Sequence, residues 1–169
     1  MEDTAKQIYM QAVRFRNASN LISKAWSETN DIDLHVAPFV VNAAFSIELH
    51  LKCLYLLENG KLPDRKVGHH LGKLYRRLSE ESRIVISMCF KLINDNDPIH
   101  QELKKQVPEA HDSIEKIIEA SSDAFKKWRY SYESGYTSFQ SSEPVLIAIE
   151  SRILQLKPEW NGTPQNVLR

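Results

Sequence analysis

The apolar residues at the start of the chain recur at helical spacing. Over residues 4–26 they return every three or four positions, which is typical of an amphipathic helix. A polar stretch over 27–35 follows, and Pro38 is well suited to open a second helix. Residues 39–57 are apolar on nearly every side. We therefore expect this second helix to be the hydrophobic centre of the molecule.

Turn-forming residues divide the middle of the chain. Gly60 can take the left-handed conformation that ends a helix, so a loop is expected over 60–68. A shorter amphipathic helix follows over 71–78, and 84–93 form another apolar helical run. The polar residues 94–98, which end in a proline, predict a strong break.

The last third of the chain predicts a long helix and a shorter one. Residues 108–132 carry an apolar stripe at helical spacing, about six turns long. After a loop over 134–142, Pro144 opens a last helix that Pro158 ends. We expect the tail over 158–169 to be loosely held.

The pattern as a whole predicts an all-α fold. No stretch alternates β-branched and polar residues, and no repeat is visible. The simplest architecture is an up-and-down bundle of four to five principal helices. A chain of 169 residues fits one domain, with its core over about 4–157.

Composition and charge narrow the setting in which the protein acts. Lysine plus arginine and aspartate plus glutamate are each 22, so no global field draws the chain to nucleic acid or to an anionic membrane. Cys53 and Cys89 lie in apolar segments, as isolated buried thiols do. The N-terminus does not resemble a signal peptide, and no run of eighteen apolar residues occurs. We expect a cytoplasmic protein with no membrane partner.

The sequence favours neither a metal nor a cofactor. Of six histidines, only His69 and His70 are adjacent, without the spaced partners of a zinc site. A glycine-rich phosphate loop and a Gly-x-Ser-x-Gly elbow are both lacking in the sequence.

Two charged residues interrupt the most apolar helix. Glu48 and Lys52 are four residues apart, so they could form a solvated pair worth about 0.3–0.5 kcal/mol. Alternatively, Glu48 has a cationic partner on another helix, for which Arg129 is the candidate. A convergence of these two groups would mark a functional cleft.

Arg129 lies among aromatic residues that include Tyr130. Aromatic faces and a planar cation are common grips on nucleotides, although the segment could equally be an aromatic-rich end of the core with one ion pair. The loop over 61–70 is locally basic, which suits either a phosphate-bearing partner or ordinary solvation. The candidate ligand-binding residues are Glu48, Lys52, His69, His70, Arg129, Tyr130 and Glu133.

Three segments resemble the HEPN superfamily of small helical domains, which is associated with nucleotide binding, toxin–antitoxin pairs and RNA cleavage. They cover residues 45–54, 68–75 and 128–133, and the order of elements fits from about 5 to 157. The resemblance implies a helical bundle, commonly dimeric, with a polar site where the later helices of two protomers meet. It also implies a role in toxin–antitoxin or defence systems, with a cognate protein partner.

The RNA-cleaving members of that family carry an arginine followed, after four to six residues, by a histidine on a late helix. The pair serves metal-independent attack of the RNA 2′-hydroxyl on the neighbouring phosphate. Arg129 is not followed by a histidine here, and only Arg65 and His70 have the spacing, in the loop. The weak catalytic candidates are Arg65, His69, His70 and Arg129.

Three functions remain open on the sequence. The favoured one is a non-catalytic HEPN-like module that binds nucleotide, RNA or a partner protein. The second is a metal-independent endoribonuclease, which requires His69 or His70 to reach the arginine. The third is a structural homodimer that scaffolds other components.

Overall fold

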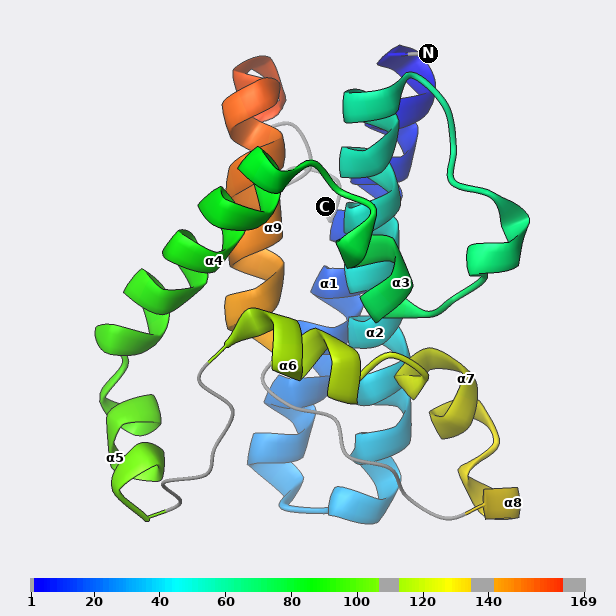
Figure 1. Cartoon of the computed structure of the whole chain (residues 1–169). Coiled ribbons are helices and arrows are strands. Elements are labelled where there is room, and N and C mark those ends of the chain that lie inside the picture. Colours follow the sequence, from blue (N-terminus) through cyan, green and yellow to red (C-terminus); the bar gives the residue numbers. More distant parts are fainter. Residues whose placement is uncertain (1, 107–112, 135–141, 163–169) are drawn as a thin grey trace.

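Every regular element in the part of the chain that the structure describes is helical. The structure is a computed structural model, and it describes residues 2–106, 113–134 and 142–162 (Figure 1). No strand occurs among these residues. The all-α prediction is therefore confirmed.

The first two helices form a long antiparallel hairpin. Helices α1 (Glu2–Thr29) and α2 (Ile32–Asn59) lie side by side along most of their length (Figure 1). The carboxylate of Asp31 caps α2 by accepting the Leu34 N–H at 3.0 Å. Because this cap satisfies one of the free N–H groups at the helix end, α2 begins upstream of Pro38. The prediction that Pro38 opens the helix is wrong.

The segment after α2 follows the predicted punctuation. Gly60 is left-handed, with φ of 67°, and donates its N–H to the Leu56 carbonyl at 2.9 Å. A loop with the short 3₁₀ helix η1 (Arg65–Val67) leads to α3 (Leu71–Arg76). Then come α4 (Glu80–Asp95) and, after the expected break, α5 (Pro98–Gln106).

The second long helix predicted over 108–132 is wrong. Its described part consists of α6 (Ile114–Ala120), α7 (Ala124–Arg129) and α8 (Ser131–Ser134), and residues 107–112 lie outside the described residues. The break has a long-range cause, because the Ser122 carbonyl accepts the Leu71 N–H of α3 at 3.2 Å. A helix that continued through Ser122 would use that carbonyl internally.

The chain then passes into its last long helix. Helix α9 (Ser142–Leu156) places Pro144 in its first turn, and η2 (Pro158–Trp160) follows. Of the loop predicted over 134–142, residues 135–141 lie outside the described residues, and its two ends, Ser134 and Ser142, belong to α8 and α9. Residues 163–169 also lie outside the described residues. Trp160 is buried and stacks on Tyr9 at 5.5 Å. The start of the tail, which was predicted to be loosely held over 158–169, is therefore packed on α1 as far as Trp160.

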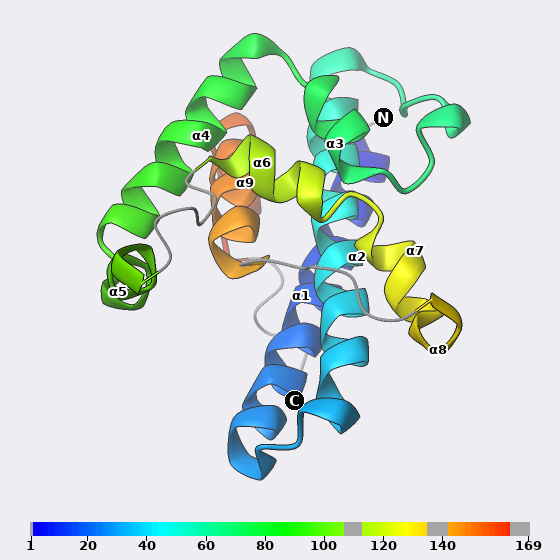
Figure 2. The same ribbon diagram turned by 60° about the horizontal axis from the view of Figure 1, so that its bottom comes forward.

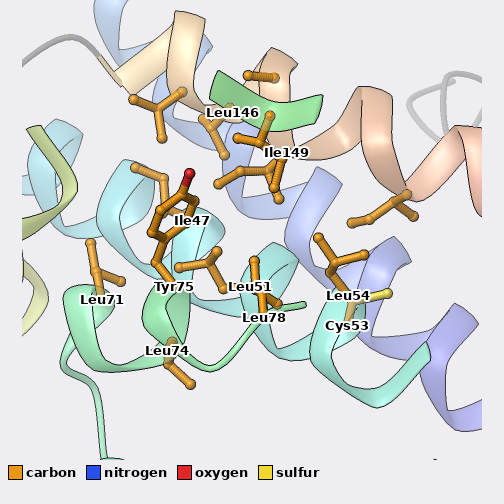
Figure 3. Close-up of a cluster of buried hydrophobic side chains, with 14 of the residues drawn as sticks. Ile47, Leu51, Cys53, Leu54, Leu71, Leu74, Tyr75, Leu78, Leu146 and Ile149 are labelled. Carbon is orange, nitrogen blue, oxygen red and sulfur yellow. The ribbon is translucent and has the colours of Figure 1, made fainter. Parts of the chain in front are cut away.

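Helix α2 is the centre of the core, as the sequence predicts. It packs against α1, α3, α7 and α9, and its buried residues meet those of α3 and α9 (Figure 3). By length and composition alone α2 could cross a membrane, but 61% of that apolar stretch is buried by its neighbours. Packing therefore accounts for its apolar composition. Core residues labelled in the close-up include Ile47, Leu51, Leu54, Leu71, Leu74, Leu146 and Ile149.

A second, smaller apolar cluster fixes α7 on the first half of α2. Val40 and Ala44 of α2 pack against Ala124 and Trp128 of α7. Helices α7 and α8 consequently lie on the opposite side of the molecule from α4 and α5 (Figure 2).

Candidate functional site

Glu48 is a fully buried carboxylate near the middle of α2. Its Oε1 accepts the Lys52 ammonium at 2.6 Å, and both of its oxygens lie 2.9 Å from His69 Nδ1. The pair with Lys52 is confirmed, but the expectation of a solvated edge is wrong for Glu48. A buried carboxylate is stable only with such partners, because burial removes its hydration.

The contact with Glu48 determines how His69 presents its ring. A carboxylate only accepts hydrogen bonds, so Nδ1 carries the proton that it donates to Glu48. In the neutral ring Nε2 is then an acceptor, and in the protonated ring it is a second donor. The His69 side chain is 51% exposed and lines a pocket, so the ring is accessible to a ligand.

An open pocket adjoins these residues. It has a volume of about 310 Å³ and is lined by Lys52 of α2 and by five residues of the following loop, Leu62, Pro63, Asp64, Gly68 and His69. This volume lies at the lower end of the range for small-molecule sites. The pocket therefore combines the Lys52 ammonium, the His69 imidazole and the Asp64 carboxylate with the apolar side chains of Leu62 and Pro63.

Arg129 reaches the same neighbourhood through an aromatic ring. The His69 ring lies 5.1 Å from the Phe125 ring, and the Arg129 guanidinium lies 4.3 Å from the centroid of that same ring. Phe125 also stacks on Phe45 of α2 at 4.7 Å, which anchors α7 beside the pocket. The guanidinium is 5.4 Å from the Tyr130 ring as well.

The predicted ion pair between Glu48 and Arg129 is not formed. The partner of Glu48 from another element is His69 instead. Arg129 is exposed and forms no ion pair within the described residues, so its guanidinium is held by cation–π contacts alone. Glu48 and Arg129 are connected indirectly: Glu48 contacts His69, the His69 ring contacts Phe125, and Phe125 contacts Arg129.

The remaining candidates lie around this assembly or apart from it. His70 caps α3 by accepting the Lys73 N–H at 3.3 Å and lines a separate pocket of about 190 Å³ with Glu119 and Asp123. Tyr130 is 44% exposed, and Glu133 is exposed on α8. The side chain of Arg65, in η1, lies outside the described residues.

Other titratable groups have structural surroundings. The Cys53 thiol is buried and donates to the Ala5 carbonyl at 3.3 Å, and burial raises its pKa to about 12. Both cysteines are free. Among the described residues, no three histidine, cysteine, aspartate or glutamate side chains converge as a metal site would require.

A polar cluster that the sequence did not predict lies between α1, α2 and α9. Tyr9 of α1 donates to Glu150 of α9 at 2.8 Å, and Arg16 pairs with both Glu143 and Glu150. His50 is fully buried beside Tyr9, with ring centroids 6.0 Å apart. Arg16 was detectable as a cation within the apolar stripe of the first helix, but its partners lie more than a hundred residues away.

A second missed arginine joins α9 to α4. Arg152 is buried, and it donates to Ser82 Oγ and to Glu81 Oε1, both at 2.8 Å. Its position between the core residues Ile149 and Ile153 was a signal that a carboxylate must meet it.

Comparisons with known proteins leave the site to be judged by its own chemistry. No protein-family model, no curated protein and no solved structure matches this chain.

Proposed function

We propose that this chain is a HEPN-like helical bundle that binds the phosphate and base of a nucleotide unit, as part of single-stranded RNA or as a free nucleotide. The observation that carries the proposal is the exposed guanidinium of Arg129 over the Phe125 ring, which also contacts an imidazole fixed by a buried carboxylate. A guanidinium without a carboxylate partner offers paired donors to a phosphate.

The aromatic surroundings of Arg129 support a base next to that phosphate. Tyr130 and Tyr132 are exposed, and their rings lie 6.3 Å apart in an edge-on arrangement. Exposed aromatic faces next to cations bind unpaired bases regardless of sequence. Lys126 adds an exposed positive charge on α7. The affinity therefore comes from a local patch, consistent with a chain of zero net charge.

The pocket beside His69 supplies the other half of the proposed site. Lys52 neutralises Glu48, so the carboxylate does not repel a phosphate as an unpaired charge would. His69 Nε2 can accept a hydrogen bond from a ribose hydroxyl or, when protonated, donate one to a phosphate oxygen.

Fluorescence anisotropy with a labelled single-stranded RNA tests the proposal, with unlabelled nucleotides as competitors. Arg129→Ala should weaken binding by about tenfold or more. It should also reduce the slope of log affinity against log salt concentration by about one. Lys24→Ala removes an exposed cation from α1 and should leave binding nearly unchanged. If the wild-type protein bound neither RNA nor nucleotide at low salt, the proposal would be wrong, and a protein partner would become the better hypothesis.

Metal-independent RNA cleavage is the second candidate, favoured by one observation. The His69 ring and the Arg129 guanidinium lie 5.1 Å and 4.3 Å from the centroid of the same Phe125 ring, so a proton acceptor and a cation border one aromatic side chain. Attack of a 2′-oxygen on the phosphate needs both, and gives a 2′,3′-cyclic phosphate and a 5′-hydroxyl.

The RNA used for binding, incubated with a chelator, separates the two candidates. His69→Asn keeps a donor for Glu48 but lacks Nε2, so it should abolish cleavage while the protein stays folded. His70→Asn is the matched control, because His70 lines the other pocket. Intact RNA with the wild-type protein would exclude the nuclease and leave the binding proposal unaffected.

A further inference from the structure

Two asparagines in the chain are each followed by a glycine, and the structure holds the two pairs differently. Asn59 and Gly60 form the end of α2, whereas Asn161 and Gly162 follow η2. In such a pair the glycine amide nitrogen can attack the carbonyl carbon of the asparagine side chain, because glycine has no Cβ that hinders the approach. The attack also requires that both groups are free to move toward each other.

At the end of α2 both reacting groups are held by hydrogen bonds. The Gly60 N–H donates to the Leu56 carbonyl at 2.9 Å, and Asn59 Nδ2 donates to the Tyr55 carbonyl at 3.0 Å. Both acceptors lie in the preceding turn of α2, so the two groups are directed back along the helix. The reaction at Asn59 would therefore require this helix end to open.

After η2 neither reacting group is held. Asn161 and Gly162 are exposed, and neither the Asn161 side chain nor the Gly162 N–H forms a hydrogen bond within the described part of the chain. The φ of −61° and ψ of 125° at Asn161, with the φ of 85° at Gly162, are typical of the central residues of a type II turn. The amide between those two residues takes no part in the hydrogen bond of such a turn.

We propose that Asn161 is a site of spontaneous deamidation in the folded protein, and that the end of α2 protects Asn59 from the same reaction. The reaction begins when base removes the proton of the Gly162 amide. The amide nitrogen then forms a bond to Asn161 Cγ, the bond from Cγ to Nδ2 breaks, and the side-chain nitrogen takes a proton from solvent and leaves as ammonia. Water opens the resulting cyclic succinimide at either carbonyl, which leaves aspartate or isoaspartate at this position.

The products alter the chain directly after its last packed side chain among the described residues. Trp160 is buried and stacks on Tyr9, whereas Asn161 is exposed. Either product adds a negative charge to a chain whose net charge is zero. Isoaspartate also lengthens the backbone by a methylene group. Because both changes lie beyond Trp160, we expect the stacking on Tyr9 and the helical fold to persist.

Peptide mapping by mass spectrometry tests the proposal on folded protein that is incubated at mildly alkaline pH and sampled over time. Asn161 should convert to aspartate and isoaspartate about tenfold faster than Asn59 or more, because two hydrogen bonds must open before Asn59 can react. In urea-unfolded protein the difference should largely disappear, because the protecting helix end is lost. Comparable rates in the folded protein, no conversion of Asn161, or an undiminished difference in urea would overturn the proposal.

Two matched glutamine variants assign the new charge to one position. Isoelectric focusing of the incubated protein should show the acidic species forming much more slowly in Asn161→Gln than in the wild type, because glutamine closes a cyclic imide less readily. Asn59→Gln should form it at the wild-type rate. Circular dichroism should show both variants folded, since both side chains are exposed. An acidic species that forms equally fast in Asn161→Gln and in the wild type would contradict the assignment to Asn161.

Discussion

At the scale of single residues, Glu48 organises the proposed site. Because its carboxylate is fully buried, it needs both the Lys52 ammonium and the His69 imidazole, which are themselves partly exposed. The need for partners holds His69 in one orientation at the pocket. A stability requirement of the core thus positions a group that a ligand can reach.

The dependence of Glu48 on Lys52 predicts that the effects of substituting these two residues on stability are not additive. Lys52→Met should cost about 2 kcal/mol, because it leaves a buried carboxylate with one partner. Adding Glu48→Gln removes that charge, so the double variant should lose less stability than Lys52→Met alone. Urea unfolding measures each free energy, and Lys24→Met on the exposed face of α1 should stay within about 0.5 kcal/mol of the wild type. Strictly additive losses would contradict this account of Glu48.

At the scale of elements, Ser122 joins two segments that are distant in the sequence. Its carbonyl accepts the Leu71 N–H and its hydroxyl accepts the Gly72 N–H at 2.9 Å, so it satisfies two of the free donors at the start of α3. The same hydroxyl donates to the Ile118 carbonyl at 3.0 Å. The fit is close, since a Cβ at Gly72 would lie 2.8 Å from that hydroxyl oxygen.

Two adjacent serines make this junction testable. Ser122→Ala leaves the buried Gly72 N–H without its partner and should cost about 1–2 kcal/mol in unfolding free energy. Ser121→Ala should be neutral or slightly stabilising, because Ser121 Oγ is buried without a hydrogen-bond partner in the described structure. Equal losses in the two variants, measured by urea denaturation, would be inconsistent with a capping role for Ser122.

At the scale of the whole molecule, the polar cluster joins the first two helices to the last. His50 Nδ1 donates to the Ser46 carbonyl at 2.9 Å, and Nε2 is buried without a partner in the described structure. Burial lowers the pKa of His50, and Arg16 acts in the same direction, while Glu150, the Ser46 carbonyl and Glu143 partly oppose the shift. The ring is therefore harder to protonate in the folded protein than in the unfolded chain.

A neutral buried histidine predicts a loss of stability in acid. The unfolded chain binds a proton at His50 near its ordinary pKa of 6.5, and the folded chain does so only at lower pH. Below about pH 6.5 stability should therefore fall, by at most about 1.4 kcal/mol per pH unit from this residue. His50→Asn keeps a donor for the Ser46 carbonyl and should flatten the decline, whereas His35→Asn, at a residue that is not buried, should not. Thermal unfolding between pH 5 and 7.5 would show the difference.

Short-range patterns predicted much of the fold. The all-α class, the central place of α2, the left-handed Gly60 and the pairing of Glu48 with Lys52 all depend on contacts within a few turns. The break within 108–132 was not predictable in this way, because its cause is the contact of Ser122 with α3. The cap at Asp31 was local and was missed because Pro38 offered a more familiar start signal.

The sequence alone determined the all-α class and the apolar character of α2, since these properties follow from spacing along one chain, whereas the division of 108–132 into shorter helices did not follow from it. It also supplied the candidate residues, including Glu48, His69 and Arg129. Tertiary structure decided how they meet, with His69 on Glu48 and Arg129 on Phe125. The physical reason is that a buried charge takes whichever partner the packing of distant segments brings within hydrogen-bonding distance, and no local pattern encodes that choice.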